Sequence, residues 1–487
     1  MYHPSSYSNK RVVVLGMARS GASIAKLFHQ YGAKVTINDM KDRKLCSEAD
    51  ELEQMGIIVI CGSHPADLVT SETALLIKNP GIPYSAPPVI AAQQLQIPII
   101  TEVEAAYYLS PAPIIGITGS NGKTTTTSLT GLLLKAAGLL PIVAGNIGRP
   151  LSEAAHEATV NDWLVAELSS FQLKGTVNFQ PHIAVLLNIS ETHLDYHGSM
   201  DDYVTAKSNI FRNQTTTDYA IWNADDPLCN RMIEKSDAKK IPFSLYEQLP
   251  YGVYVSPPYK KDAAEPLNTD PSLLEERYIV YREEASDSEI EQEAVQIVKV
   301  RDLSIPGKHN VANALAALAI VIATGVKPQQ VVAELCQFKG VEHRLEFVRE
   351  MNGVAYYNDS KATNAVATMM SVSSLPEKVI LIAGGLDRGS DYSELLPLMK
   401  ERVKAVVLLG QTRFKLAEIA KQAGLICIEI VEPDEDVEKV MQQATRKAAS
   451  LANPGDIVLL SPACASWDMF DSFEQRGSMF KNSTHTL

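Results

Sequence analysis

The sequence predicts an α/β protein with mainly parallel sheets, divided into three domains. Its 487 residues are the length of about three ordinary domains. Short apolar runs alternate with helical patterns in three regions of the chain, which is typical of parallel sheets covered by helices. A proline-containing break at residues 110–113 precedes the second region, and the third begins near residue 341. We therefore expect domains at residues 1–101, 102–341 and 342–487.

The first region repeats a strand–helix pattern. The apolar runs that we interpret as strands are residues 11–15, 34–38, 57–61, 74–78 and 98–100, and residues 20–31 have helical periodicity. The turn after the first strand reads GMARSG, with Ala18 where a dinucleotide-binding fingerprint has its second glycine. Asp39 follows the second strand at about the spacing of a ribose-binding acid. This turn fits nucleotide binding, and it also fits close strand–helix packing without a ligand.

The second and third regions continue the alternation. In the second region we expect strands at residues 114–118, 163–166, 183–188 and 219–222, and helices at 124–137 and 310–323. In the third region we expect strands at residues 354–357, 379–383, 405–409 and 457–460. Between about residues 245 and 287 the pattern gives way to proline, tyrosine and acidic residues. We expect an insertion there that forms a long loop or an irregular hairpin, at the periphery of the second domain.

Composition excludes several classes of protein. The net charge of −13, from 57 acids and 44 bases, argues against nucleic-acid binding but allows an anionic substrate in a locally basic pocket. No segment approaches the roughly 20 apolar residues that span a bilayer, and the first residues lack a signal-peptide core. The six cysteines are scattered without metal-ligand spacing, which favours a reducing compartment. We therefore expect a cytoplasmic protein without membrane insertion.

The strongest local signal is the glycine-rich turn GITGSNGKTT, residues 116–125, between a strand and a helix. Successive backbone N–H groups in such a turn bind phosphate, helped by the helix N-terminus. Lys123 would reach the terminal phosphates of a nucleotide, and the Thr124 hydroxyl would hold a metal ion. The strict P-loop pattern has a glycine at position 117, where this chain has Ile117. The candidate phosphate-binding residues are Gly119, Ser120, Asn121, Gly122, Lys123, Thr124 and Thr125.

Further metal ligands are expected at the same edge of the sheet. Glu167 ends the strand WLVAE, and His193 and Asp195 follow the next strand. Mg²⁺ prefers oxygen ligands, so His193 needs either a second metal ion or direct contact with a substrate. A surface glutamate and a structural histidine are the alternative interpretations of Glu167 and His193.

Eight motifs in order resemble the Mur ligase family, and among its members those that add D-glutamate. They are TGSNGKTT, AELSSFQL, NISETHLDYHG, KHNVANALAA, HRLE, NDSKATN, GGLDRG and SPACASWDMFDSFEQRG. Together they cover nearly the whole chain except the N-terminal tail and the 245–287 segment. The resemblance implies a Rossmann-like N-terminal domain for the UDP-sugar, a central P-loop ATPase domain, and a Rossmann-like C-terminal domain for the amino acid.

The resemblance also implies an activity in peptidoglycan precursor synthesis, and hence in cell-wall growth, cell shape and division. ATP would phosphorylate the alanyl carboxylate of UDP-N-acetylmuramoyl-L-alanine. The amine of D-glutamate would then attack the acyl-phosphate, and a tetrahedral intermediate would collapse to an amide and phosphate. The implied cofactors are ATP and Mg²⁺ at two sites, with Mn²⁺ as an alternative metal. The implied protein is a monomer.

Site residues follow from the resemblance, motif by motif. Glu167 and His193 match magnesium-site residues, and Lys207 matches a lysine that the family carbamylates, which makes it an oxygen ligand. The ATP contacts are Lys123, Thr124, Asn313, Arg344 and Asp359. The UDP-substrate contacts are Arg19, Ser20, Asp39, Lys41, Asn79, Gly81, Asn146 and His193. The D-glutamate contacts are Lys361, Thr363, Arg388, Ser466, Trp467 and Phe473.

Two positions depart from the family, and several have simpler interpretations. Asn79 stands where the family usually has serine, and Arg388 where its best-known members have lysine. An arginine fork can bind a carboxylate at two points, but it does not replace lysine in every geometry. Judged by sequence alone, Lys207 would be a solvated cation, Ser466 a helix N-cap and Phe473 a core residue.

Three other functions compete with D-glutamate ligation. A regulatory or mechanical P-loop ATPase would release phosphate without an acceptor, and the NDSKATN and SPACAS loops argue against it. A dinucleotide-dependent oxidoreductase would use the first domain, and Ala18 argues against it. A related ligase would use another amino acid or a polyglutamate acceptor, and exchange of amino acids in one assay distinguishes it.

Overall fold

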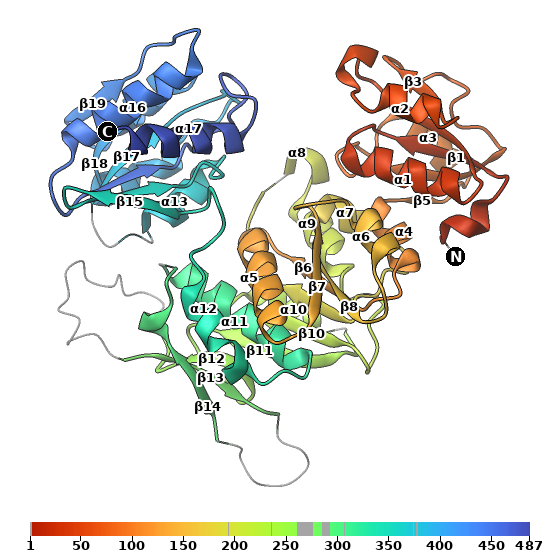
Figure 1. Cartoon of the computed structure of the whole chain (residues 1–487), viewed down its shortest axis with the longest axis horizontal. Helices are drawn as coiled ribbons and strands as arrows, with labels where there is room; N and C mark the ends of the chain where they lie inside the picture. The colour runs from red at the N-terminus through yellow and green to blue at the C-terminus, as the bar shows by residue number, and fades with distance from the viewer. Residues whose placement is uncertain are drawn as a thin grey trace. The chain divides into compact units, whose positions relative to one another are not determined.

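The chain folds into three sheets surrounded by helices (Figure 1). The structure is a computed structural model that describes residues 2–192, 194–234, 236–260, 276–284, 293–305, 307–373, 375 and 378–487. One compact unit holds the first two sheets, and a second unit holds the third sheet. The α/β class with mostly parallel sheets is confirmed, whereas the domain limits at 101/102 and 341/342 stay predictions.

The N-terminal sheet is entirely parallel, with the strand order β3-β2-β1-β4-β5 among the described residues. Its strands are β1 (Arg11–Leu15), β2 (Lys34–Asp39), β3 (Ile58–Cys61), β4 (Thr73–Lys78) and β5 (Ile99–Ile100). Its helices are α1 (Arg19–Gln30), α2 (Ala49–Gln54) and α3 (Pro87–Gln94). Alternate residues of β1 face opposite sides, because side chains alternate along a strand. Val12 and Val14 pack with Phe28 of α1, whereas Val13 and Leu15 pack with α3.

The central sheet has the order β14-β13-β12-β11-β10-β9-β6-β8-β7 among the described residues. Its strands are β6 (Ile114–Thr118), β7 (Leu140–Gly145), β8 (Asp162–Glu167), β9 (Ile183–Leu186), β10 (Tyr219–Asn223), β11 (Lys239–Ser244), β12 (Gly252–Ser256), β13 (Tyr278–Arg282) and β14 (Val295–Lys299). The strands from β7 to β12 are parallel. Because β6 lies between β8 and β9, the loops after these three strands meet at one edge of the sheet.

Helices join and cover the central strands. They are α4 (Glu102–Leu109), α5 (Lys123–Ala136), α6 (Leu151–Glu157), α7 (Ser170–Lys174), α8 (Leu194–His197), α9 (Met200–Ser208), α10 (Pro227–Ile233), α11 (Lys308–Ala323) and α12 (Val332–Gln337). Short 3₁₀ helices are η1 (Pro4–Tyr7), η2 (Arg43–Leu45), η4 (Val300–Asp302), η5 (Pro328–Val331) and η6 (Ser393–Leu395). In the part of the chain that is described, no helix is long and apolar enough to cross a membrane.

The 245–287 segment is more regular than expected. It contributes β12 and β13, which pair antiparallel with Gly252 opposite Arg282, and β12 extends the sheet beside β11. Tyr254 of β12 is fully buried. The expected long loop is therefore wrong over these two strands, which form a regular antiparallel pair because tyrosines and valines pack well in a sheet. Residues 261–275 and 285–292 lie outside the described residues.

The C-terminal sheet has the order β15-β16-β20-β17-β18-β19 among the described residues. Its strands are β15 (Glu346–Met351), β16 (Val354–Asn358), β17 (Val379–Ala383), β18 (Val403–Leu408), β19 (Cys427–Ile430) and β20 (Ile457–Leu460), and only the β15–β16 pair is antiparallel. Its helices are α13 (Ala365–Ser373), α14 (Leu396–Arg402), α15 (Arg413–Gln422), α16 (Val437–Leu451) and α17 (Phe473–His485). Ile380 and Ile382 pack with α16 and α17, and Leu381 packs on the opposite face.

Candidate active site

The glycine-rich turn after β6 forms a loop that leads directly into α5. Gly122 caps the helix with φ of 84°, a left-handed conformation that favours glycine. A Cβ atom on Gly122 would lie 2.3 Å from Oδ1 of Asn313 on α11. Position 122 therefore admits only glycine. The first backbone N–H groups of α5 lie at this loop, where a helix N-terminus attracts an anion.

Lys123 folds back over this loop. Its Nζ donates hydrogen bonds to the carbonyl oxygens of Gly119 and Ser120, both at 2.9 Å. The Thr124 and Thr125 side chains that follow are buried. The ammonium group therefore lies where it can neutralise an anion that binds to the loop.

The segment after β9 is fastened to the same loop. Oδ1 of Asn188 accepts from the backbone N–H of Asn121 at 2.8 Å, and its Nδ2 donates to the Asn121 carbonyl at 3.1 Å. The N–H of Ser190 donates to Oγ of Ser120 at 2.9 Å, and that hydroxyl lies 2.8 Å from the Tyr203 hydroxyl. The chain after β9, which leads to position 193, is therefore held against the glycine-rich loop at residues 119–125, which we call the phosphate loop.

Glu167 ends β8 and pairs in register with Ile117 of β6. It is 1% exposed, so a surface glutamate is the wrong interpretation. Oε1 accepts a hydrogen bond from Nδ2 of Asn146 at 2.9 Å. Among the described residues, no donor reaches Oε2, which is also buried. Because an unpaired buried carboxylate oxygen is costly, this atom fits a cation ligand.

Lys207 of α9 is buried beside the phosphate loop. Its Nζ donates to the Gly119 carbonyl at 2.8 Å and to Oγ1 of Thr118 at 3.2 Å, and it lies 5.0 Å from the centre of the Tyr203 ring. Burial, and then the charge of Lys123, hold the pKa of Lys207 well below its usual value. The interpretation of Lys207 as a solvated cation is therefore wrong, and burial favours its neutral amine.

The remaining metal-site candidates lie partly outside the described residues. His193 is one of the residues that the structure does not describe, so its predicted role stays a prediction. The helix α8 begins at the next residue, Leu194. Asn313, a predicted ATP contact, is buried at the start of α11 and accepts from Oγ1 of Thr126 at 3.2 Å.

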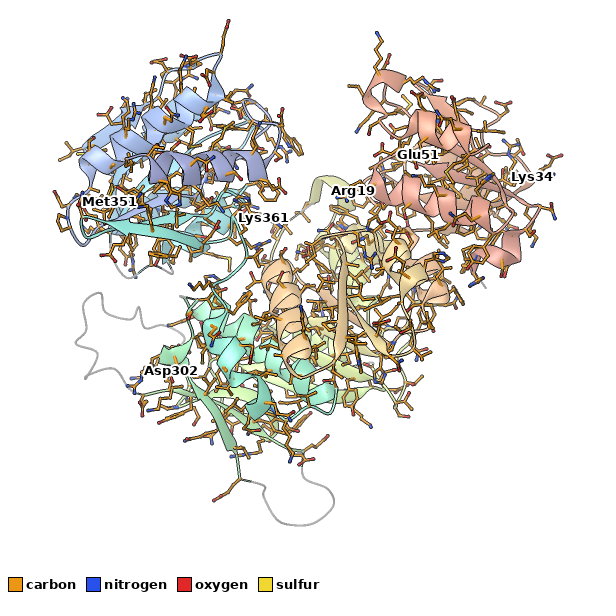
Figure 2. All side chains as sticks on the ribbon, in the orientation of Figure 1. Arg19, Lys34, Glu51, Asp302, Met351 and Lys361 are labelled. Atoms are coloured by element: carbon orange, nitrogen blue, oxygen red, sulfur yellow. The ribbon has the colours of Figure 1, made fainter. Side chains whose placement is uncertain are left out.

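The N-terminal candidates gather at the carboxyl ends of β1, β2 and β4. The Asp39 carboxylate accepts from the N–H groups of Met17 at 2.8 Å and Lys41 at 2.9 Å, so it shapes the glycine-rich turn. Oγ of Ser20 donates to Oδ1 of Asn79 at 3.4 Å. Three other candidates in this part of the chain are exposed: Arg19, Lys41 and Gly81. Figure 2 labels Arg19 in the first turn of α1.

In the C-terminal unit, a buried arginine joins two loops. Arg476 of α17 is 0% exposed and donates to the Ser360 carbonyl at 2.7 Å, to Oγ of Ser360 at 3.0 Å and to the Cys464 carbonyl at 3.1 Å. These loops carry Lys361 and Thr363 on one side and Ser466 on the other. Burial lowers the pKa of Arg476 to about 10, which leaves it charged at neutral pH.

The D-glutamate candidates form two observed pairs in this unit. Nζ of Lys361, labelled in Figure 2, lies 5.2 Å from the centre of the Phe473 ring. The Arg388 guanidinium lies 5.0 Å from the centre of the Trp467 ring, which is 66% exposed. Ser466 is buried and does not cap α17, because Ser472 does. The N-cap interpretation of Ser466 is therefore wrong.

Asp359, a predicted ATP contact, is buried among protein donors. Its carboxylate accepts from the N–H of Leu345 at 3.1 Å and from Oγ of Ser461 at 2.8 Å. Burial raises its pKa to about 6, and the charge of Arg344 partly opposes this rise. Arg344 and Asp359 therefore lie within electrostatic reach of each other.

Family models match along most of the chain. A Mur ligase MurD-like N-terminal domain matches residues 10–101, a Mur ligase middle domain matches 117–321, and a Mur ligase glutamate ligase domain matches 343–464. The chain belongs to the Mur ligase family. The family that the motifs suggested is therefore confirmed.

Curated relatives and solved structures agree with this membership. A UDP-N-acetylmuramoylalanine–D-glutamate ligase of Geobacillus sp. (strain WCH70) is 46% identical over 488 residues, which covers 100% of both chains. The ligase of that name from Geobacillus kaustophilus is also 46% identical, over 99% of this chain and 98% of its own. UDP-N-acetylmuramate-alanine ligase MurC from Thermotoga maritima has a TM-score of 0.57 at 19% identity and covers 98% of this chain and 99% of its own. This structural likeness shows the fold alone.

Sequence reasoning missed several residues of this Mur ligase site. Asn188, Ser190 and Tyr203 hold the phosphate loop, and Arg476 holds the loops of the C-terminal unit. Asn188 and Ser190 lie in the quoted motif NISETHLDYHG, whose polar residues directly follow a buried strand. Arg476 lies in FEQRG within a mostly polar helix, where the sequence carries no local sign that this arginine is buried.

Proposed function

We propose that this Mur ligase joins D-glutamate to UDP-N-acetylmuramoyl-L-alanine and converts ATP to ADP and phosphate. The observation that carries the proposal is the full-length match, at 46% identity, to a relative named for that reaction. The phosphate loop at residues 119–125 supports the use of ATP. The product belongs to peptidoglycan precursor synthesis.

Phosphorylation makes the substrate carboxylate reactive. A carboxylate is a poor electrophile, and transfer of the γ-phosphoryl group of ATP to one of its oxygens creates a leaving group. Lys123 and the loop N–H groups stabilise the charge that gathers on the phosphoryl oxygens. The amine of D-glutamate then attacks the acyl carbon, and the tetrahedral intermediate expels phosphate and forms the amide.

The proposal includes Mg²⁺ held by Thr124, Glu167, His193 and a carbamylated Lys207, in two sites, with Mn²⁺ as an alternative. Oε2 of Glu167, which has no hydrogen-bond partner among the described residues, supports a cation at this place. When bound, the metal ion neutralises phosphate charge. The neutral Lys207 amine supports carbamylation, because only the free base attacks CO₂; it loses a proton and becomes an anionic carbamate.

The substrate contacts in this proposal follow the motifs. Residues proposed to bind ATP beyond the loop are Asn313, Arg344 and Asp359. Residues proposed to bind the UDP-substrate are Arg19, Ser20, Asp39, Lys41, Asn79, Gly81, Asn146 and His193. Residues proposed to bind D-glutamate are Lys361, Thr363, Arg388, Ser466, Trp467 and Phe473. The proposed enzyme is a cytoplasmic monomer that binds no nucleic acid.

Phosphate release measured with each substrate omitted in turn tests the function. We expect release only when ATP, UDP-N-acetylmuramoyl-L-alanine and D-glutamate are all present. Release that ignores both acceptors would indicate a P-loop ATPase of another kind. Release with a different amino acid, and none with D-glutamate, would indicate a related ligase with another substrate.

A further inference from the structure

Lys78, the last residue of β4, is a fully buried lysine that the proposed reaction does not use. Its Nζ lies 3.1 Å from the Tyr196 hydroxyl, 3.2 Å from the Pro80 carbonyl and 3.5 Å from the Asn79 carbonyl. It also lies 4.7 Å from the centre of the Tyr84 ring. Among the described residues, no carboxylate accepts a hydrogen bond from this amine. Burying an amine with only neutral acceptors is costly, so packing alone does not explain a lysine here.

Tyr196, on α8 of the central domain, contacts the same turn as Lys78. Its hydroxyl lies 3.0 Å from the Pro80 carbonyl and 3.3 Å from the Ile82 carbonyl. The N–H of Ile82 also donates to the Asn79 carbonyl at 3.0 Å, which closes a turn over residues 79–82. Three carbonyls of this turn are therefore engaged on its buried side, while Gly81 is exposed. We call residues 79–82 the substrate loop, because Asn79 and Gly81 are proposed substrate contacts.

Residues of α7 and α9 hold Tyr196 and its helix in place. The Tyr196 ring packs edge-on against Phe171, with centres 4.5 Å apart. Lys174 of α7 pairs with Asp202 of α9 at 2.7 Å, and Asp202 lies 2.6 Å from Nδ1 of His197. The helices α7, α8 and α9 pack together (Figure 1). The substrate loop is therefore tied to the helix that follows position 193 and to the helix that carries Lys207.

Other contacts already hold the N-terminal sheet against the central domain. Oγ of Ser23 on α1 lies 3.1 Å from Oγ of Ser152 on α6, and Oγ1 of Thr101 donates to the Gln172 carbonyl at 2.7 Å. Neither contact touches the substrate loop. Lys78 and Tyr196 differ from these residues because both side chains donate hydrogen bonds to carbonyls of the substrate loop.

We propose that Lys78 and Tyr196 are positioning residues, which hold the substrate loop in register with α8 and so place the UDP-sugar relative to the phosphoryl-transfer site. This inference rests on the proposed function. Lys78 orients the carbonyls of the loop inward, and Tyr196 fixes the loop to the central domain. Loss of either contact frees the loop before substrate binds, so substrate binding must order it. The effect falls on affinity for the UDP-sugar, because the residues proposed to bind ATP and D-glutamate lie outside this loop.

Tyr196→Phe and Lys78→Met test the proposal, alone and combined. Tyr196→Phe keeps the ring on Phe171 and removes only the hydroxyl, so this variant tests the contact even if Lys78→Met folds poorly. We expect each to raise the KM for UDP-N-acetylmuramoyl-L-alanine about tenfold, which is the size of a buried hydrogen bond, with kcat and the KM values for ATP and D-glutamate within about twofold. The double variant is expected to raise the KM by less than the product of the two single effects, because the two side chains share one hydrogen bond and the Pro80 carbonyl.

Ser23→Ala is the matched control, since it removes a hydrogen bond between the same two domains away from the loop. We expect its UDP-sugar KM to stay within about twofold of the wild type. An unchanged UDP-sugar KM in Tyr196→Phe, or an equal rise in Ser23→Ala, would overturn the proposal. Wild-type turnover, measured beside the variants, separates this outcome from failure of the proposed function, in which the wild type itself releases no phosphate.

Discussion

Two lysines of the phosphate site share one hydrogen-bond acceptor. Nζ of Lys123 and Nζ of Lys207 lie 2.9 Å and 2.8 Å from the same Gly119 carbonyl. Two ammonium groups so close would repel each other strongly in a buried place. The charge is therefore expected on Lys123, which is less buried, and the neutral amine on Lys207, whose pKa is lowered by burial and by Lys123.

Lys123→Ala tests the role of the charged lysine. We expect phosphate release to fall at least about 100-fold, because the phosphoryl oxygens lose their nearest cation. Unfolding in urea should change little, since Asn188 and Ser190 also hold this loop. Turnover near the wild-type rate would contradict the assignment of the phosphate loop.

Lys207→Ala tests the neutral lysine. We expect a loss of at least about 100-fold in turnover, with partial recovery when a short carboxylate such as acetate is added in excess. Recovery is expected because a carboxylate supplies the anionic oxygen that a carbamate would supply. Lys207→Arg serves as the control, since it keeps a cation and should not recover. Equal recovery of both variants would contradict the carbamate.

At the scale of elements, helices serve as clamps for loops that lie far apart in the sequence. The α17 helix carries Arg476, which holds the loop after β16 to the loop after β20 through Ser360 and Cys464. The buried Glu104 of α4 accepts from the N–H groups of Val177, Asn178 and Phe179, and so fixes the turn before β9. In both cases a charged group satisfies backbone groups of a neighbouring segment of chain.

Arg476→Lys tests the clamp in the C-terminal unit. Lysine keeps the charge but cannot reach three acceptors in the planar geometry of a guanidinium. We expect the KM for D-glutamate to rise about tenfold, with the UDP-sugar KM unchanged. Arg349→Lys is a matched control in the same unit, because Arg349 donates to the Thr484 carbonyl near the surface. Similar D-glutamate KM values in both variants would argue against the clamp.

Among the elements, strands made of a continuous apolar run were easier to predict than strands of mixed composition. The runs predicted at 114–118, 354–357, 379–383 and 457–460 are strands that the structure places inside their sheets, where both faces are apolar. β7, β15 and β19 at sheet edges and β11 inside the central sheet were missed because these strands are partly exposed and their residues are mixed, whereas the edge strands β3 and β5 were predicted. A strand of mixed composition gains its partner from the rest of the fold, which local pattern does not report.

At the scale of the whole molecule, a net charge of −13 coexists with an anionic set of proposed substrates. A few cations placed on the candidate loops explain how a negatively charged protein can bind anionic substrates. Lys123 lies at the phosphate loop, and Lys361 and Arg388 lie on loops of the other compact unit. Net charge therefore describes the surface, and the binding of anions depends on a few placed cations and on backbone N–H groups.

The buried Lys78 makes stability depend on pH. Burial, and then the charge of Lys174, lower its pKa to about 7 from 10.5. The unfolded chain therefore holds this proton between about pH 7 and 10 while the folded protein does not, and stability rises with pH in that range. Below pH 7 both states hold the proton, so the cost of burial is full and constant.

Urea unfolding of the wild type and of Lys78→Met at pH 7 and pH 9 measures this effect. We expect the wild type to gain stability relative to Lys78→Met as the pH rises, because only the wild type carries the titrating amine. Titrating groups far from Lys78 are common to both proteins and cancel in the difference. A constant difference, or one that favours Lys78→Met at pH 9, would contradict a buried, neutral lysine.

The sequence by itself determined the fold class, the phosphate loop and the family, because strand–helix periodicity and eight short motifs are local in the chain. Only the tertiary structure decided which groups meet. It showed that the Asp39 carboxylate binds backbone N–H groups of the turn at Met17 and that Oε2 of Glu167 lacks a donor among the described residues. It also showed that Lys78 reaches Tyr196, which is 118 residues away. Burial and partnership between distant residues depend on how the sheets and helices pack, and packing is a property of the whole chain.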